Sequence, residues 1–100
     1  MPAYVIMSSF TEEGLQHAKQ VPPEIAAAKK IAPKYNVTLP PNNLYMLMGG
    51  DYDFLAHVQA PDDKAVTEFV LAAGMSGYTK PVILQSFTEA EINEIFSKLQ

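Results

Sequence analysis

The sequence predicts a single α+β domain spanning residues 1–100, built on a four-stranded antiparallel sheet with helices against one face. Four segments rich in strand-forming residues alternate with segments of helical periodicity. Two of the strands follow each other across a glycine turn at residues 49–51, which is typical of a β-hairpin. Apolar residues make up 48% of the chain, enough for a core, and the length leaves little room for a second domain.

The first half of the chain predicts one strand followed by two helical segments. Residues 3–10 are rich in strand formers, and Thr11 then supplies the hydroxyl of a helix N-cap. The two prolines at residues 22–23 interrupt that helix, but proline is tolerated in a first turn. A second helical segment is therefore expected to restart there and to end at residues 33–36. Residues 37–43 contain two further prolines and are expected to be irregular or to form an edge segment.

The second half predicts a hairpin, a helix and a fourth strand. Residues 44–48 and 52–60 are the two expected strands of the hairpin. Asp62 is the expected N-cap of a helix with apolar residues at helical spacing, and Gly74 and Gly77 are expected to stop it. Residues 79–87 are the fourth predicted strand.

A closing amphipathic helix is predicted after the last strand. It begins at Thr88, which together with Glu91 has the spacing of a capping box. The tetrapeptide Ser-Phe-Thr-Glu occurs twice, at residues 9–12 and 86–89, each time at a strand-to-helix junction. Convergent capping and a weak internal duplication both explain this repeat, and neither implies chemistry.

The predicted order β-α-β-β-α-β-α folds, with right-handed crossovers, into the ferredoxin-like arrangement with the spatial strand order 4-1-3-2. Strand residues alternate between two faces, and residues 54, 56 and 58 form one wholly apolar set. We assign that set to the face under the helices, which is expected to carry Val5, Met7, Met46, Met48, Phe54, Ala56, Val58, Val82 and Leu84. The opposite face is expected to carry Tyr4, Ile6, Ser8, Phe10, Tyr45, Leu47, Leu55, His57, Ile83, Gln85 and Phe87.

The second face would be too apolar to remain in water, which indicates a homodimer. Its large side chains would contribute about 16 kcal/mol gross, at about 2 kcal/mol each, against an association cost of about 4–15 kcal/mol. The closing helix is one candidate cover, and a second copy of the chain is the favoured one. Two such sheets facing each other form a dimeric α+β barrel, whose interior would hold the polar residues Ser8, His57 and Gln85.

Composition excludes several classes of function. The formal net charge of −4 disfavours nucleic acid or an anionic membrane surface as a partner. The absence of cysteine excludes disulfides, a thiolate metal site and a cysteine nucleophile. Neither histidine has metal-ligand spacing, so no metal or cofactor is expected. Because the chain has no apolar run of membrane-spanning length and residues 1–4 do not resemble a signal peptide, a cytoplasmic protein is expected.

The hairpin carries recognisable residues. Residues 50–53, Gly-Asp-Tyr-Asp, have the form Gly-x-Tyr-Asp and precede Phe-Leu-Ala at 54–56 and Ala-Pro-Asp-Asp at 60–63. With residues 4–15 upstream and 86–91 downstream, their order and spacing resemble the GYD domain family of small bacterial and archaeal proteins. The resemblance covers nearly the whole chain. It implies a dimeric α+β barrel and no established activity.

His57 is the main candidate for catalysis. It lies mid-strand on the mixed face, and an imidazole that titrates near neutrality can act as a general base, although a hydrogen-bonded structural histidine is the alternative. Asp53 lies about 13 Å from it along the strand, too far for a direct hydrogen bond, and capping of its own turn is the alternative for Asp53. Packing and dimer contacts are the alternatives for Tyr4 and Gln85. The residues expected to line a ligand site are Tyr4, Ser8, Asp53, Leu55 and Gln85.

Three functional hypotheses follow, and the first is favoured. The chain is a homodimeric binding or sensor module that holds a small, partly apolar molecule between sheets and helices. Alternatively, it is a cofactor-independent enzyme of the oxygenase, isomerase or decarboxylase type with His57 as general base, or an assembly subunit without a ligand. An enclosed pocket reached by His57 would support the first two hypotheses, and a filled interior would support the third.

Overall fold

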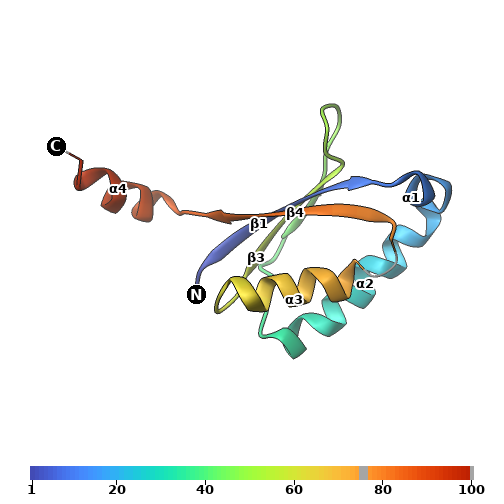
Figure 1. Cartoon of the computed structure of the whole chain (residues 1–100), viewed down its shortest axis with the longest axis horizontal. Helices are drawn as coiled ribbons and strands as arrows, with labels where there is room; N and C mark the ends of the chain where they lie inside the picture. Colours follow the sequence, from blue (N-terminus) through green and yellow to red (C-terminus); the bar gives the residue numbers. More distant parts are fainter. Residues whose placement is uncertain (75–76, 100) are drawn as a thin grey trace.

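The structure is a computed structural model that describes residues 1–74 and 77–99. Its elements follow the order predicted from the sequence (Figure 1). The strands are β1 (Ala3–Phe10), β2 (Leu44–Met46), β3 (Phe54–Gln59) and β4 (Thr79–Ser86). The helical segments are α1 (Glu12–Gln16), η1 (Ala18–Gln20), α2 (Val21–Ile31), η2 (Ala32–Tyr35), α3 (Asp63–Ala73) and α4 (Glu89–Ser97).

The four strands form one antiparallel sheet in the order β2-β3-β1-β4. Read from the other edge, this is the order 4-1-3-2 expected from the sequence. Helices α2 and α3 cover one face of the sheet, and no helix of the described residues covers the other (Figure 1). Helix α4 continues from the end of β4 and projects away from the rest of the molecule.

Side-chain caps fix where the helices begin. The Thr11 hydroxyl accepts a hydrogen bond from the Gly14 amide at 2.9 Å, and the Asp62 carboxylate accepts one from the Ala65 amide at 2.8 Å. Helix α2 begins at Val21 with the two prolines in its first turn, where their missing amide protons cost no helical hydrogen bond. These starts agree with the predictions made from the sequence.

The core lies between the sheet and the two covering helices. Val58 of β3 and Val66 of α3 are the largest fully buried side chains in the described chain. The other buried hydrophobic residues are Tyr4, Ile6, Ala32, Val37, Ala60, Phe69 and Val70. The proline-containing segment before β2 is largely irregular, as expected, and joins the sheet through one bridge in which Thr38 and Gln59 exchange amide-to-carbonyl hydrogen bonds.

The face assignment is confirmed for β3 and wrong for β1 and β4. Tyr4 pairs with Val58 and Ile6 pairs with Ala56, and residues paired across an antiparallel ladder share a face. Both alternating sets of β1 are apolar, so the period of two could not decide between them. The helix-covered face therefore carries Tyr4, Ile6, Ser8, Leu44, Met46, Phe54, Ala56, Val58, Pro81, Ile83 and Gln85. The uncovered face, called the open face below, carries Val5, Met7, Tyr45, Leu55, His57, Lys80, Val82 and Leu84.

The hairpin between β2 and β3 projects from the sheet on the side opposite α2 and α3 (Figure 1). The Leu47 amide donates to the Asp53 carbonyl at 2.8 Å, and Gly49 and Gly50 adopt positive φ at the predicted turn. Met48, expected to lie in the core, is instead 92% exposed near the tip. No helix among the described residues has the length and apolar character needed to cross a bilayer.

Candidate ligand cavity

A cavity of about 180 Å³ lies between the sheet and helices α2 and α3. Residues from every layer of the domain contribute to its wall. The strands supply Ile6, Leu44, Phe54, Ala56 and Val58, and the helices supply Val21, Ile25, Ala28, Phe69, Val70 and Ala73. The same inward-facing alternation and helical spacing that build the core therefore leave a hollow beside it. A wall of this kind suits a small molecule that is mainly apolar.

A few polar groups also reach the cavity wall. Ser8 of β1, Asn43 before β2 and Thr79 of β4 line it, with Glu24 and Lys29 contributed by α2. Within the described residues the Ser8 hydroxyl has no protein hydrogen-bond partner. A hydroxyl in this position can bind one polar group of an otherwise apolar ligand.

Tyr78 lines one end of the cavity, and α1 holds it in place. The Tyr78 carbonyl accepts a hydrogen bond from the Thr11 amide at 3.1 Å, and the ring stacks on His17 with centroids 5.6 Å apart. Gly14 is buried against the same carbonyl, and a Cβ at Gly14 would lie only 2.0 Å from that oxygen. Glycine is thus required for the close approach of α1 to the start of β4.

The structure places the predicted catalytic histidine away from this cavity. His57 lies on the open face, with its side chain exposed and its ring edge-on to Tyr45 at a centroid distance of 6.3 Å. Its amide donates to the Asn43 carbonyl at 2.7 Å, which ties β3 to the segment before β2. Leu55 shares the open face with His57, as expected, so the sheet separates both residues from the cavity.

Tyr4 has a structural partner on the helix-covered face. Its hydroxyl donates a hydrogen bond to the Asp63 carboxylate at 2.5 Å and so ties β1 to the first turn of α3. The side chain is 3% exposed. The hydrogen bond to Asp63, burial, and the negative charges of Asp63 and Asp62 raise the pKa of Tyr4 from 10.0 to about 12. The expectation that Tyr4 lies on the same face as His57 is wrong, because the register pairs it with buried Val58.

The other predicted ligand residues are divided between two places. Ser8 and Gln85 were expected beside His57, but the register puts both on the helix-covered face, where Ser8 lines the cavity. Asp53 accepts a hydrogen bond from the Phe10 amide at 2.8 Å, and its own amide donates to the Ser8 carbonyl. Asp53 therefore joins the base of the hairpin to β1, and of the predicted set only Ser8 lines the cavity.

Sequence reasoning did not identify most of the cavity wall. The helical spacing around Ile25 and Phe69 predicted buried faces for α2 and α3, but no sequence pattern separates a filled core from a hollow one. Asn43 lies in an irregular segment, and nothing in its neighbourhood indicates that it contributes to the wall. No group of three or more histidine or acidic side chains suited to a metal ion occurs within residues 1–74 and 77–99.

Fold and cavity together define a small α+β domain with one helix-covered sheet face, one uncovered face and an apolar pocket under the helices. The family model of the GYD domain matches residues 4–96, so the chain belongs to the GYD domain family, as its sequence resemblance indicated. No match was found among the curated proteins.

Proposed function

We propose that this protein is a homodimeric small-molecule-binding module of the ferredoxin-like, dimeric α+β barrel type. Each subunit binds one small, mainly apolar molecule in the cavity between its sheet and helices α2 and α3. The observation that carries the proposal is the cavity itself, which has a largely apolar wall and one unpartnered hydroxyl from Ser8 among the described residues.

Cavity size restricts the ligand class. Apolar cavities of about 150 Å³ hold a benzene molecule, and the volume here is about 180 Å³. A single six-membered ring with one small substituent matches this volume. One hydroxyl or carbonyl group on that ring would bind the Ser8 hydroxyl, so phenols and similar uncharged aromatic compounds are the proposed class.

Dimerisation is supported by the apolar character of the open face. Tyr45, Val82 and Leu84 are each about half exposed there, next to the partly buried Val5 and Met7. Two facing sheets pack about 10 Å apart and remove such side chains from water. In that dimer the two open faces would form the barrel interior, with His57 inside it.

Binding is favoured over the alternatives because of where the cavity lies. The candidate cavity, with its largely apolar wall, lies on the other side of the sheet from His57, which instead lines a separate hollow together with Tyr45 and Gln59. An assembly subunit without a ligand does not require a hollow core, which loses packing energy.

The cavity is tested by filling it. Ala28 lines the cavity from α2, and Ala27 is exposed on the same helix, so Ala28→Leu and Ala27→Leu add the same atoms inside and outside the cavity. Phenol and toluene binding is measured by ligand-observed NMR titration. We expect saturable binding to the wild type and to Ala27→Leu, and at least tenfold weaker binding to Ala28→Leu.

The hydroxyl is tested separately. Ser8→Ala should weaken phenol binding about fivefold, equivalent to about 1 kcal/mol for one hydrogen bond, and leave toluene binding unchanged. Equal binding of both probes by the wild type and Ala28→Leu would contradict the cavity as the site. Failure of the wild type to saturate with either probe would contradict the proposed ligand class.

A further inference from the structure

Helix α4 carries an apolar stripe that its own subunit does not cover. None of its residues 89–97 is buried, and the helix projects beyond the end of β4 (Figure 1). The large apolar side chains that lie along it, or directly beside it, are Phe87, Ile92, Ile95, Phe96 and Leu99. Phe96 and Leu99 are 64% and 68% exposed. The spacing of these residues along the helix is that of a stripe made to contact another surface.

The start of α4 is well defined even though its stripe is uncovered. The Glu91 amide donates to the Thr88 hydroxyl at 3.2 Å, and the Thr88 amide donates to the Glu91 carboxylate at 2.9 Å, which completes a capping box. Isolated helices shorter than about 12 residues are marginal in water even with good caps. A helix of nine residues therefore needs a packing partner to remain helical.

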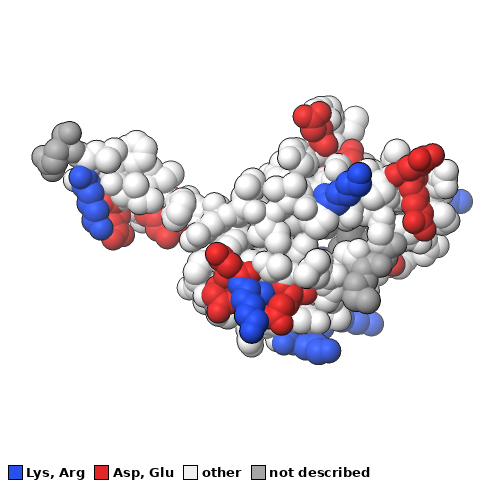
Figure 2. Space-filling model, in the orientation of Figure 1, with Lys and Arg blue, Asp and Glu red and all other residues white. Residues whose placement is uncertain are grey.

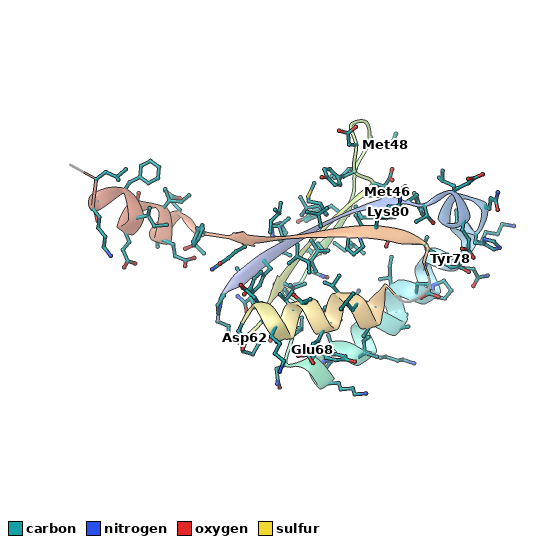
Figure 3. All side chains as sticks on the ribbon, in the orientation of Figure 1. Met46, Met48, Asp62, Glu68, Tyr78 and Lys80 are labelled. Atoms are coloured by element: carbon teal, nitrogen blue, oxygen red, sulfur yellow. The ribbon has the colours of Figure 1, made fainter. Side chains whose placement is uncertain are left out.

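The opposite end of the sheet offers a complementary surface. Figure 3 shows Met48 near the tip of the hairpin, which projects on the side away from α2 and α3. Met46 and Met48 belong to the projecting hairpin and are 65% and 92% exposed. Methionine side chains are flexible and adapt to apolar surfaces. Lys80 lies on the open face of β4, the edge strand opposite β2, and is therefore not part of the hairpin surface.

Acidic side chains occur both on α4 and on the hairpin. Figure 2 shows acidic side chains along the C-terminal helix, and the sequence places Glu89, Glu91 and Glu94 in it. The hairpin carries Asp51 and Asp53, so the arm and the hairpin match in apolar character and not in charge. The chain's own arm follows Ser86, which pairs with Ala3 at the far end of β1 from the hairpin, so α4 and the hairpin of one subunit do not meet.

We propose that α4 is an exchanged arm, which packs its apolar stripe on a second copy of the chain, against the projecting hairpin that carries the exposed Met48. A twofold axis that brings each arm to the other copy's hairpin makes the contact reciprocal. This inference rests on the homodimer of the proposed function and adds to it the part of the chain that locks the two copies together.

The exposed area is sufficient for such a contact. Large side chains present on the order of 200 Å² when fully exposed, so one that is half exposed offers on the order of 100 Å². The arm residues together with Tyr45, Val82 and Leu84 then offer roughly 800 Å² per copy, about the size of one side of a standard stable interface.

The first experiment compares two variants that each place a lysine on one face of the arm. Ile95→Lys places a lysine on the apolar stripe, and Ser97→Lys places one on the opposite face of α4 with the same change in charge. Light scattering over a dilution series measures the dimer dissociation constant of each protein. The wild type and Ser97→Lys are expected at twice the 11.0 kDa chain mass, with at least tenfold weaker association for Ile95→Lys. Equal dissociation constants for the two variants, or a monomeric wild type at every concentration, would overturn the exchanged arm.

The second experiment identifies the surface that the arm contacts on the other copy. It uses the absence of cysteine from the chain, so that each introduced cysteine is the only one in its protein. Proteins carrying Phe96→Cys and Met48→Cys, distinguished by different tags, are mixed and treated with a short bismaleimide. A cross-linked species containing both tags is expected, whereas Ser97→Cys in place of Phe96→Cys should give at least fivefold less. Equal yields would show that the stripe does not face the hairpin and would overturn the proposal.

The two proposals fail separately. Ile95→Lys should retain the phenol binding of the wild type, because the cavity is built within one subunit. Absence of phenol binding from a wild-type dimer that Ile95→Lys weakens would overturn the proposed ligand site and support the arm. Normal phenol binding with no effect of Ile95→Lys on association would support the proposed ligand site and overturn the exchanged arm.

Discussion

Single residues carry much of the connection between layers in this domain. Tyr4 joins β1 to α3 through Asp63, and Asp53 joins the hairpin to β1 through the Phe10 amide. Each contact uses a polar side chain to satisfy a group that packing alone would leave without a partner. Asp53, the last residue of the Gly-x-Tyr-Asp motif, thus has a structural role in the position where the sequence also allowed ligand binding.

The Tyr4 contact gives a stability that depends on pH. The folded-state pKa of about 12 lies above the ordinary 10.0, so the contribution of the neutral phenol is complete below pH 10 and is lost as the pH rises to 12. Urea denaturation of the wild type and Tyr4→Phe should show a stability difference that is constant between pH 8 and 9.5 and shrinks between pH 10 and 12. A difference independent of pH up to 12 would contradict the raised pKa of Tyr4.

Gly14 gives a steric prediction. A Cβ at this position would lie 2.0 Å from the Tyr78 carbonyl oxygen and 3.1 Å from the Phe10 ring, so Gly14→Ala must push α1 away from β4. We expect a loss of about 1–3 kcal/mol in the free energy of unfolding, as for other overpacked sites. Gly50→Ala is the comparison, because nothing lies within 4 Å of its Cβ and its cost is limited to positive φ. A smaller loss for Gly14→Ala than for Gly50→Ala would contradict this account.

At the scale of elements, the repeated Ser-Phe-Thr-Glu sequence has two unequal roles. Thr11 caps α1 and its hydroxyl also donates to the Gly77 carbonyl at 2.8 Å, so it connects two parts of the domain body. Thr88 caps only α4, which has no buried residue. Similar local sequences therefore start helices that differ in how much of the fold depends on them.

The same substitution should separate these two roles. Thr11→Ala is expected to lower the free energy of unfolding by about 2 kcal/mol, since it removes a cap worth about 1 kcal/mol and a second hydrogen bond. Thr88→Ala should change unfolding of the domain body by less than about 0.5 kcal/mol and reduce only the helix content of α4 and the dimer affinity. Circular dichroism during urea denaturation measures both. Equal losses of body stability would argue that α4 packs on its own subunit.

Elements were predictable where a local rule determines them. The caps at Thr11, Asp62 and Thr88 and the proline start of α2 follow from side-chain chemistry within a few residues, and all four were predicted. The sequence did not predict which residues of β1 and β4 face the helices. In β1, for example, Tyr4 and Val5 begin two equally apolar alternating sets. That choice depends on pairing with β3 and on the helices above it, which no local pattern encodes.

At the scale of the whole molecule, the open face controls assembly. Leu84 lies on it and is half exposed, whereas its neighbour Gln85 is exposed on the other face. Leu84→Lys should weaken dimerisation at least tenfold, because it places a charge in an apolar contact, and Gln85→Lys should leave it unchanged. The dependence of the unfolding midpoint on protein concentration measures this, and loss of that dependence is expected only for Leu84→Lys. Equal behaviour of the two variants would argue against a dimer through the open face.

Whole-molecule features were the least predictable from sequence. The apolar content predicted a core, and the hollow beside Ile25 and Phe69 arises from how separate elements fit together. His57 was correctly placed on the face without helices, but the cavity formed on the other side. The candidate site inferred from one strand thus depended on how the sheet packs against both covering helices.

The central position of β1 has a consequence for how the protein is made. Ala3 pairs with Gln59 on one side and with Ser86 on the other, so the strand synthesised first waits for partners that emerge much later. Loop closure over such separations is slow compared with helix formation. During translation we expect β1 to remain unpaired until the third strand leaves the ribosome and to keep one edge unpaired until the fourth strand follows, which makes it the segment most in need of chaperone protection.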